Sequence, residues 1–281
     1  MPDAVSMSNL ATWGLQSACV ALSAGLAIRV LPLPSAELRY AVWRTALLAC
    51  FVVPLLPGGW RRLEVAGGDV AALVLSPGPF DVAAVPPPAI PWPSLAWGAI
   101  GLVVALRAAW LIAGMSRLRS LRRRGSAADT PEFADAQWAL GTRAEIRYAA
   151  GLAQPVTFGL RRPVVLLPLS VADGPASVRR AVTTHELLHV QRHDWGWVLF
   201  EEALRTVCWC NPAVWWLTSR VQHAREEVVD HLTVLAIGSR REYIEALLAF
   251  ADAHAPVAAP AFARRAQLFV RIMRISSDAP L

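Results

Sequence analysis

The chain has 281 residues, which is long enough for two structural units of different character. Hydrophobic residues make up 55% of it and charged residues only 17%, below the roughly 25% that is usual in soluble domains, so we expect part of the chain to lie in lipid. All 27 basic residues are arginine, which excludes P-loops and acylation sites that depend on lysine. The net charge of +6 comes from arginines beside apolar segments, so we expect no direct nucleic-acid binding.

Three apolar segments in the N-terminal part predict membrane-spanning helices. Residues 10–28 carry no charge over 19 positions, close to the length of about 20 residues that spans a bilayer as a helix. Residues 41–56 form a shorter apolar segment, and residues 95–114 are apolar except for Arg107. Five arginines follow the last segment before the next acidic residue. Because the cytoplasmic ends of membrane helices are rich in arginine, these residues place that end in the cytoplasm.

These patterns divide the chain into two predicted domains. Residues 1–116 are expected to form a membrane domain with about three transmembrane helices in the cell (inner) membrane. The Gly- and Pro-rich stretch 58–91 is expected to be an extracytoplasmic loop. Beyond Gly125 the composition becomes mixed, and we expect a cytoplasmic α+β domain over residues 117–281. The predicted fold class is therefore an α-helical membrane anchor followed by an α+β domain.

Two apolar segments of the second domain have specific predicted places. The segment Val164-Val165-Leu166-Leu167 is bracketed by prolines, which favours an edge strand that pairs with an extended substrate segment. The segment 195–218 is rich in tryptophan, and a fourth membrane crossing is one interpretation of it. Its two acidic residues and the break at Asn211-Pro212 favour a helical hairpin in the core or at the membrane surface instead.

The sequence His185-Glu186-Leu187-Leu188-His189 points most clearly to chemistry. Residues four apart lie one turn apart on the same face of a helix, so the two histidines can present imidazole nitrogens to one metal ion. Glu186 projects beside that site, where it can take a proton from water and later pass it to the leaving amine. The pattern predicts a zinc-dependent protease with Glu186 as the catalytic residue and with His185 and His189 as ligands of one Zn2+ ion.

A third protein ligand is expected downstream, since catalytic zinc sites have three protein ligands and an open fourth position. Glu226 and Asp230 lie four apart on a predicted helix. We assign Glu226 as the third ligand and Asp230 as the residue that accepts a hydrogen bond from a zinc-bound histidine. Glu227 points about 100° away and is the weaker candidate. His193 lies about 12 Å along the helix from His185, too far to join the same ion.

Other polar residues near the motif are expected to act elsewhere. Asp194 is expected to be structural, and Tyr148 and Tyr243 are expected to pack. The sequence names no residue that would stabilise an oxyanion.

Several motifs follow one another in the C-terminal half: Pro155-Val156-Thr157-Phe158-Gly159, the stretch from Pro163 to Pro168, His185 to His189, Asp194, Asn211-Pro212, and Arg225-Glu226 with Asp230. Over residues 154–275 this series resembles the membrane-bound antirepressor metallopeptidases of the BlaR/MecR type, and the N-terminal helices resemble them more loosely. The resemblance implies a zincin-like domain of the gluzincin class that faces the cytosol. It also implies a protein substrate, such as a transcriptional repressor, and a role in signal transduction.

A rival hypothesis is a non-catalytic membrane signalling or scaffold protein with a structural zinc site. Such a site usually has four protein ligands, whereas three are evident, and Glu186 would have no role in it. The sequence ends at Leu281 without a penicillin-binding domain. We therefore expect a different inducing signal or a separate sensor partner, and a homo-oligomer is also left open.

Overall fold

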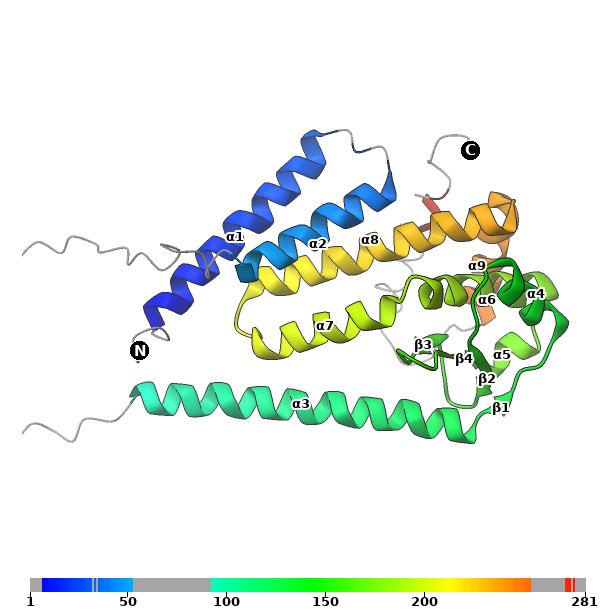
Figure 1. The fold of residues 1–281 in the computed structure, drawn as a ribbon, viewed down its shortest axis with the longest axis horizontal. Coiled ribbons are helices and arrows are strands. Elements are labelled where there is room, and N and C mark those ends of the chain that lie inside the picture. The colour runs from blue at the N-terminus through cyan, green and yellow to red at the C-terminus, as the bar shows by residue number, and fades with distance from the viewer. Residues whose placement is uncertain are drawn as a thin grey trace, which may run out of the picture.

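The computed structural model describes residues 7–31, 33, 35–52, 92–253, 271–273 and 275. In chain order its elements are α1 Met7–Val30, α2 Ala36–Val52, α3 Trp92–Arg124, β1 Ser126–Ala127, α4 Pro131–Ala139, β2 Glu145–Ala149, β3 Val156–Phe158, β4 Val164–Pro168, α5 Leu169–Ala172, α6 Ala176–Gln191, α7 Asp194–Val207, α8 Pro212–Ile237 and α9 Arg240–Ala253. The long helices α3, α7 and α8 run roughly along one direction while α1 lies obliquely to them, and the small sheet lies at one end with α4, α5, α6 and α9 (Figure 1). The expected loop 58–91 lies outside the described residues.

Two helices of the described part are long and apolar enough to cross a membrane, α1 over Ala11–Val30 and α3 over Ser94–Arg124. No residue in the most apolar part of α3 is fully buried against protein. Apolar side chains that no protein covers favour lipid as their surroundings. The remaining predicted span, 41–56, begins inside α2, whose 17 residues give only about 26 Å of helix. Two of the three predicted segments therefore meet the requirements of a crossing.

A mixed sheet of four strands has the order β1-β2-β4-β3. Strand β4 pairs in parallel with β2 and antiparallel with β3, so the prediction that Val164, Val165, Leu166 and Leu167 form an edge strand is wrong. The prolines stand at the ends of this segment, where they remove no hydrogen bond from its interior, and the Pro163 carbonyl accepts one from β2. A continuous run of fully buried apolar side chains is typical of an interior strand. The edge strand on this side of the sheet is β3.

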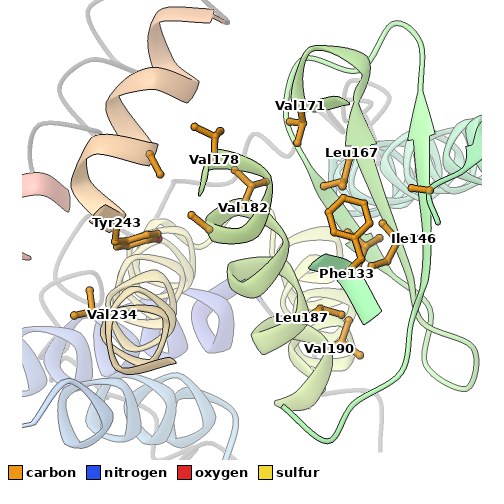
Figure 2. Packing of buried hydrophobic residues seen from close by; sticks show 14 of the residues in the cluster. Phe133, Ile146, Leu167, Val171, Val178, Val182, Leu187, Val190, Val234 and Tyr243 are labelled. Carbon is orange, nitrogen blue, oxygen red and sulfur yellow. The ribbon is translucent and has the colours of Figure 1, made fainter. Parts of the chain in front are cut away.

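Both faces of the sheet are covered. One face packs with α4, α6 and α9 around a core that includes Leu167, Leu187 and Tyr243 (Figure 2). The other face, through Leu166, belongs to a cluster that includes Leu118 near the end of α3. The sheet therefore holds α6 on one side and is attached to the long helix α3 on the other.

A separate core joins the N-terminal helices to α8. It contains Leu47 and Cys50 of α2 together with Leu217, Val221 and Val228 of α8. Since α2 precedes the predicted domain boundary and α8 follows it, both predicted domains contribute to this core. The two-domain division of the chain stays a prediction.

Helices α7 and α8 form a hairpin over the segment 195–218. The predicted break at Asn211-Pro212 is confirmed, because α7 ends before it and the Asn211 side chain caps the first turn of α8. The same side chain donates to Ser17 of α1 at 3.1 Å. Ser17 lies about 20 Å along α1 from its end at Val30. The tip of the hairpin therefore lies beside the middle of α1.

Candidate metal centre

Helix α6 positions the histidine motif. Leu187 is fully buried in the core between α6 and the sheet. On a helix with 3.6 residues per turn, His185 and His189 project from a different face than Leu187 does. Their ring centroids lie 5.0 Å apart. The packing of the leucine thus fixes the direction in which both imidazoles point.

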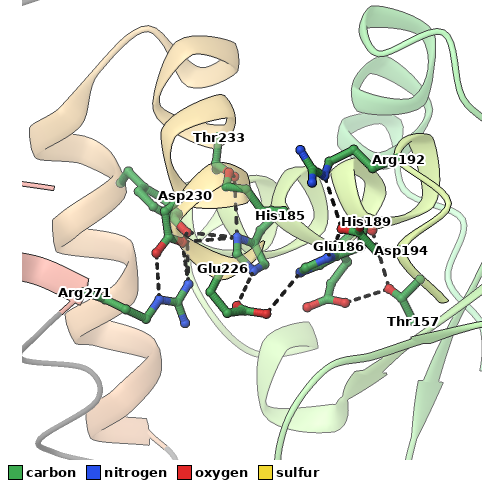
Figure 3. A network of polar contacts seen from close by, with 12 residues as sticks. Thr157, His185, Glu186, His189, Arg192, Asp194, Glu226, Asp230, Thr233 and Arg271 are labelled. Atoms are coloured by element: carbon green, nitrogen blue, oxygen red, sulfur yellow. Dashed lines mark hydrogen bonds and ion pairs between the residues drawn. The ribbon is translucent and has the colours of Figure 1, made fainter. Parts of the chain in front are cut away.

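Helix α8 brings Glu226, the residue assigned as third ligand, to the two histidines (Figure 3). Its Oε2 lies 3.6 Å from Nε2 of His185, and its Oε1 lies 3.7 Å from Nε2 of His189. Ligand atoms of these three residues all lie within 4.8 Å of one another, a spacing that can hold one metal ion. Burial raises the pKa of Glu226, but contact with His185 and the charges of His189 and Arg271 outweigh it and hold this pKa well below its usual range. The carboxylate is therefore ionised, which is the form that binds a cation.

The other ring nitrogen of His189 has a partner nearby in the sequence. Its Nδ1 lies 2.9 Å from Oδ2 of Asp194, the first residue of α7. The chain turns from α6 into α7 at His193, whose φ of 57° is uncommon for a residue other than glycine. Burial lowers the pKa of His189, but the hydrogen bond to Asp194 and the negative charges of Glu226, Glu186 and Asp194 together outweigh this effect and raise the pKa. Asp194 therefore orients a candidate ligand, a role that the sequence analysis missed.

The other ring nitrogen of His185 has partners from later helices. Tyr243 Oη lies 3.0 Å from Nδ1 of His185 and donates its own proton to Oδ1 of Asp230 at 2.7 Å. Because that proton is directed to Asp230, the phenol oxygen accepts the hydrogen bond from His185. Asp230 Oδ1 lies 3.5 Å from the same ring nitrogen, so Tyr243 is the nearer partner. The orienting role assigned to Asp230 stays a prediction, and the expectation that Tyr243 only packs misses this contact.

Asp230 is held in turn by an arginine from the C-terminal part of the chain. Arg271 donates from Nε to Oδ2 at 2.9 Å and from Nη2 to Oδ1 at 2.6 Å, a bidentate pair. Burial lowers the pKa of Arg271, but the charge of Asp230, the hydrogen bond to it and the charges of Tyr243 and Glu226 together outweigh this effect and raise it, so the guanidinium stays charged. Nothing in the spacing of the sequence marks Arg271 as part of the site.

Glu186 lies beside the candidate ligands. Among the described residues, the group that could hold the metal consists of His185, His189 and Glu226 and does not include Glu186. Glu186 is only 9% exposed, and its Oε2 accepts a hydrogen bond from Thr157 Oγ1 at 2.6 Å. Thr157 is the middle residue of β3, so the edge strand borders this carboxylate (Figure 3). One carboxylate oxygen is thereby fixed, and the other can take a proton. The arrangement can bind a metal ion and move a proton at the same place.

Comparison with known proteins places the chain in a family. Residues 9–275 match the family model of the BlaR1 peptidase M56. The chain belongs to this family. This match confirms the resemblance to the BlaR/MecR type that the sequence motifs indicated.

Individual relatives match this chain over a limited stretch of its length. The regulatory protein BlaR1 of Bacillus licheniformis is 31% identical over 101 residues. The methicillin resistance mecR1 proteins of Staphylococcus aureus and Staphylococcus epidermidis are each 29% identical over 100 residues. In each case the match covers 35% of this chain and only 17% of the length of the relative.

Proposed function

We propose that this M56 protein is an integral-membrane zinc metalloendopeptidase that acts in signal transduction. The proposal rests on one observation, the group His185, His189 and Glu226 with the carboxylate of Glu186 held beside it. A structural zinc site has no use for a fixed carboxylate that does not bind the metal. The arrangement therefore favours a peptidase over the rival non-catalytic scaffold.

The donor set fits one Zn2+ ion. Zinc binds imidazole and carboxylate well, and three protein ligands with an open fourth position are usual in its catalytic sites. Asp194 and Tyr243 support the assignment, because each occupies the ring nitrogen that faces away from the ligand group. A bound zinc ion would polarise the scissile carbonyl and lower the pKa of a neighbouring water molecule.

Glu186 is proposed to move the proton during hydrolysis. Thr157 donates to its Oε2, which leaves Oε1 to accept a proton from the attacking water. The water oxygen forms a bond to the carbonyl carbon, and the carbon–nitrogen bond breaks. Glu186 then returns its proton to the leaving amine nitrogen, so that the residue ends in its starting state.

The substrate is proposed to pair with β3 rather than with β4. Among the described strands, β3 pairs on one side only, with β4, so its other side has no strand partner and is the proposed place for an extended peptide. Thr157 of β3 contacts Glu186, so a peptide paired there would pass beside the proposed base. Main-chain hydrogen bonds would hold this peptide with little demand on its side chains.

The proposed substrate is a cytoplasmic regulatory protein such as a transcriptional repressor, as the family resemblance implies. The candidate span of α3 ends in arginines, which supports a cytoplasmic position for the elements that follow it. The protein is proposed to be a multi-pass protein of the cell (inner) membrane, with its catalytic domain in the cytoplasm. The activating signal is proposed to be a different inducing signal or to come from a separate sensor protein. Assembly of the chain into a homo-oligomer is a separate proposal.

The substitution Glu186→Gln tests the proposal, because it keeps the shape of the side chain and removes the proton acceptor. The full chain in lipid nanodiscs should retain its zinc, measured by elemental mass spectrometry. Cleavage of a purified repressor encoded nearby should fall by about 100-fold or more. Unchanged cleavage by a folded, zinc-loaded variant would contradict the peptidase proposal and favour a different base.

A further inference from the structure

The turn between β3 and β4, residues 159–163, exposes an unusual set of side chains. Leu160 is 60% exposed, although Phe158 before the turn and the whole of β4 after it are buried. Arg161 and Arg162 follow it and are exposed as well. An apolar side chain next to two cations, outside the protein core, has the chemistry that a membrane interface can bind: acyl chains for the leucine and anionic headgroups for the arginines.

The register of the sheet shows that this turn points towards the membrane-spanning part of α3. Strand β2 begins at Glu145, which forms an ion pair with Arg122 of α3, and continues to Tyr148, which pairs with Ser126 beyond the end of that helix. From Glu145 onward, β2 therefore runs away from the membrane-spanning part of α3. Strand β4 is parallel to β2, with Val164 opposite Glu145. The residues just before Val164 thus lie at the end of the sheet that is nearer to the membrane-spanning part of α3.

The neighbours of the turn agree with this direction. Phe158, which precedes the turn, belongs to a cluster with Leu118, about 9 Å before the end of α3. The Leu160 side chain lies beside Gly196, where an added Cβ would be 3.4 Å from its Cδ2. Trp195 packs edge-on against Phe158 with ring centroids 6.2 Å apart. From this point α7 runs alongside α3 towards α1 and α2 (Figure 1).

The backbone of the turn is fixed by a glycine. Gly159 has a φ of 101°, a conformation that side chains other than hydrogen rarely adopt. A Cβ at this position would lie 2.5 Å from the carbonyl oxygen of Arg162, which is closer than atoms can approach. The turn is therefore tight, and its backbone holds Leu160 and both arginines in one place.

We propose that this turn docks on the cytoplasmic leaflet, with Leu160 at the edge of the acyl chains and Arg161 and Arg162 on the headgroups of anionic phospholipids. Exposed arginines at the end of α3 extend the same positive charge: Arg117, Arg119, Arg123 and Arg124. Phosphate groups of acidic lipids complement this rim, and the uncovered apolar surface of α3 continues it into the bilayer. Because β3 leads into this turn, the docked turn holds the open strand edge at the membrane surface.

Spin labelling of the full chain in lipid nanodiscs measures the position of the turn. The two exposed cysteines, Cys19 and Cys210, are replaced by alanine, and a nitroxide is attached after Leu160→Cys. Trp138→Cys provides the matched control, because Trp138 is 87% exposed on α4, at the end of the molecule away from α1 and α2 (Figure 1). Relaxation by oxygen and by a water-soluble nickel chelate reports the depth of each label.

In nanodiscs that contain phosphatidylglycerol, the label at 160 should be several-fold more accessible to oxygen, relative to nickel, than the label at 138. The double change Arg161→Glu with Arg162→Glu should move the label at 160 towards water. The corresponding pair of glutamines removes the positive charges without adding negative ones and should move the label less. Nanodiscs of phosphatidylcholine alone should give a shallower label. Equal nickel access at both labels, or a depth that is independent of lipid charge, would overturn the proposal.

The proposal depends on the proposed membrane residence of α3 but not on zinc or hydrolysis. Glu186→Gln should therefore leave the depth of the label at 160 unchanged. A shallow label in a chain that still cleaves its substrate rejects the docking alone, whereas a deep label in a chain that never cleaves rejects the peptidase alone.

Discussion

The two histidines of the candidate metal centre are oriented in different ways. His189 relies on Asp194, five residues further along the chain and 2.9 Å away. His185 relies on three groups from α8 and α9: Tyr243 at 3.0 Å, and Asp230 and Thr233, each at 3.5 Å. A support from a residue nearby in the sequence needs only local structure, but replacing that one side chain removes it. A support assembled from distant helices is partly redundant, yet it requires the complete fold.

The largest effect should come from the residue that both histidines share. Glu226→Ala removes a ligand rather than a support, so zinc affinity should fall by more than the roughly 100-fold that marks the loss of a supporting contact. Competition with a chelator of known affinity measures it. His193→Asn is the control, since asparagine tolerates the left-handed backbone at that position. An equal loss in the control would reject the ligand assignment.

The next largest effect is expected at the local support. Asp194→Ala removes the acceptor at Nδ1 of His189 and should weaken zinc binding by about 10- to 100-fold. Asp194→Asn keeps an oxygen at nearly the same place and should lose less. If both variants bind zinc as tightly as the parent chain in the same competition experiment, Asp194 is only structural.

A smaller effect is expected on the other side of the site. Tyr243→Phe removes the hydroxyl group, but Asp230 and Thr233 remain within 3.5 Å of the same nitrogen, so zinc affinity should fall by about tenfold or less. Combining Tyr243→Phe with Thr233→Val should cost more than the sum of the single changes, because Asp230 is then the last of the three supports near that nitrogen. A single-variant loss as large as that of Asp194→Ala would break the comparison.

The smallest effect on zinc is expected for Arg271→Gln, which acts on His185 only through Asp230. Its main consequence should be on folding, because it leaves a buried carboxylate without its bidentate partner, at a cost of about 1–3 kcal/mol. Thermal unfolding of the metal-free chain should show a lower midpoint. Arg241→Gln breaks a largely exposed pair with Glu245 and should leave the midpoint nearly unchanged.

The sequence was sufficient where the geometry is local. The spacing of His185 and His189 and the place of Glu186 follow from the helical period alone. The break at Asn211-Pro212 was recognisable from residue types as well. Asp194 is also local, but its contact with His189 depends on the left-handed turn at His193, which residue spacing does not reveal.

The sequence was insufficient where strands and distant helices meet. Prolines on both sides of Val164-Val165-Leu166-Leu167 favoured an edge strand, whereas four apolar residues in a row, buried on both faces, are typical of an interior strand. Tyr243 and Arg271 reach the site only because α9 and the C-terminal part fold back onto α8. No periodicity within one element encodes such a contact.

The core shared by α2 and α8 has a practical consequence for purifying the part of the chain that carries the candidate metal centre. Every candidate ligand lies beyond residue 117, which invites expression of a shortened, water-soluble fragment. Removing α1 and α2 would bare Val214, Leu217 and Val221, which are at most 1% exposed in the intact chain. Such a fragment would expose an apolar surface on α8, the helix that also carries Glu226. We expect it to aggregate or to lose the geometry of the candidate metal centre. Detergent or lipid, together with the N-terminal helices, belongs in any preparation intended to keep the candidate metal centre intact.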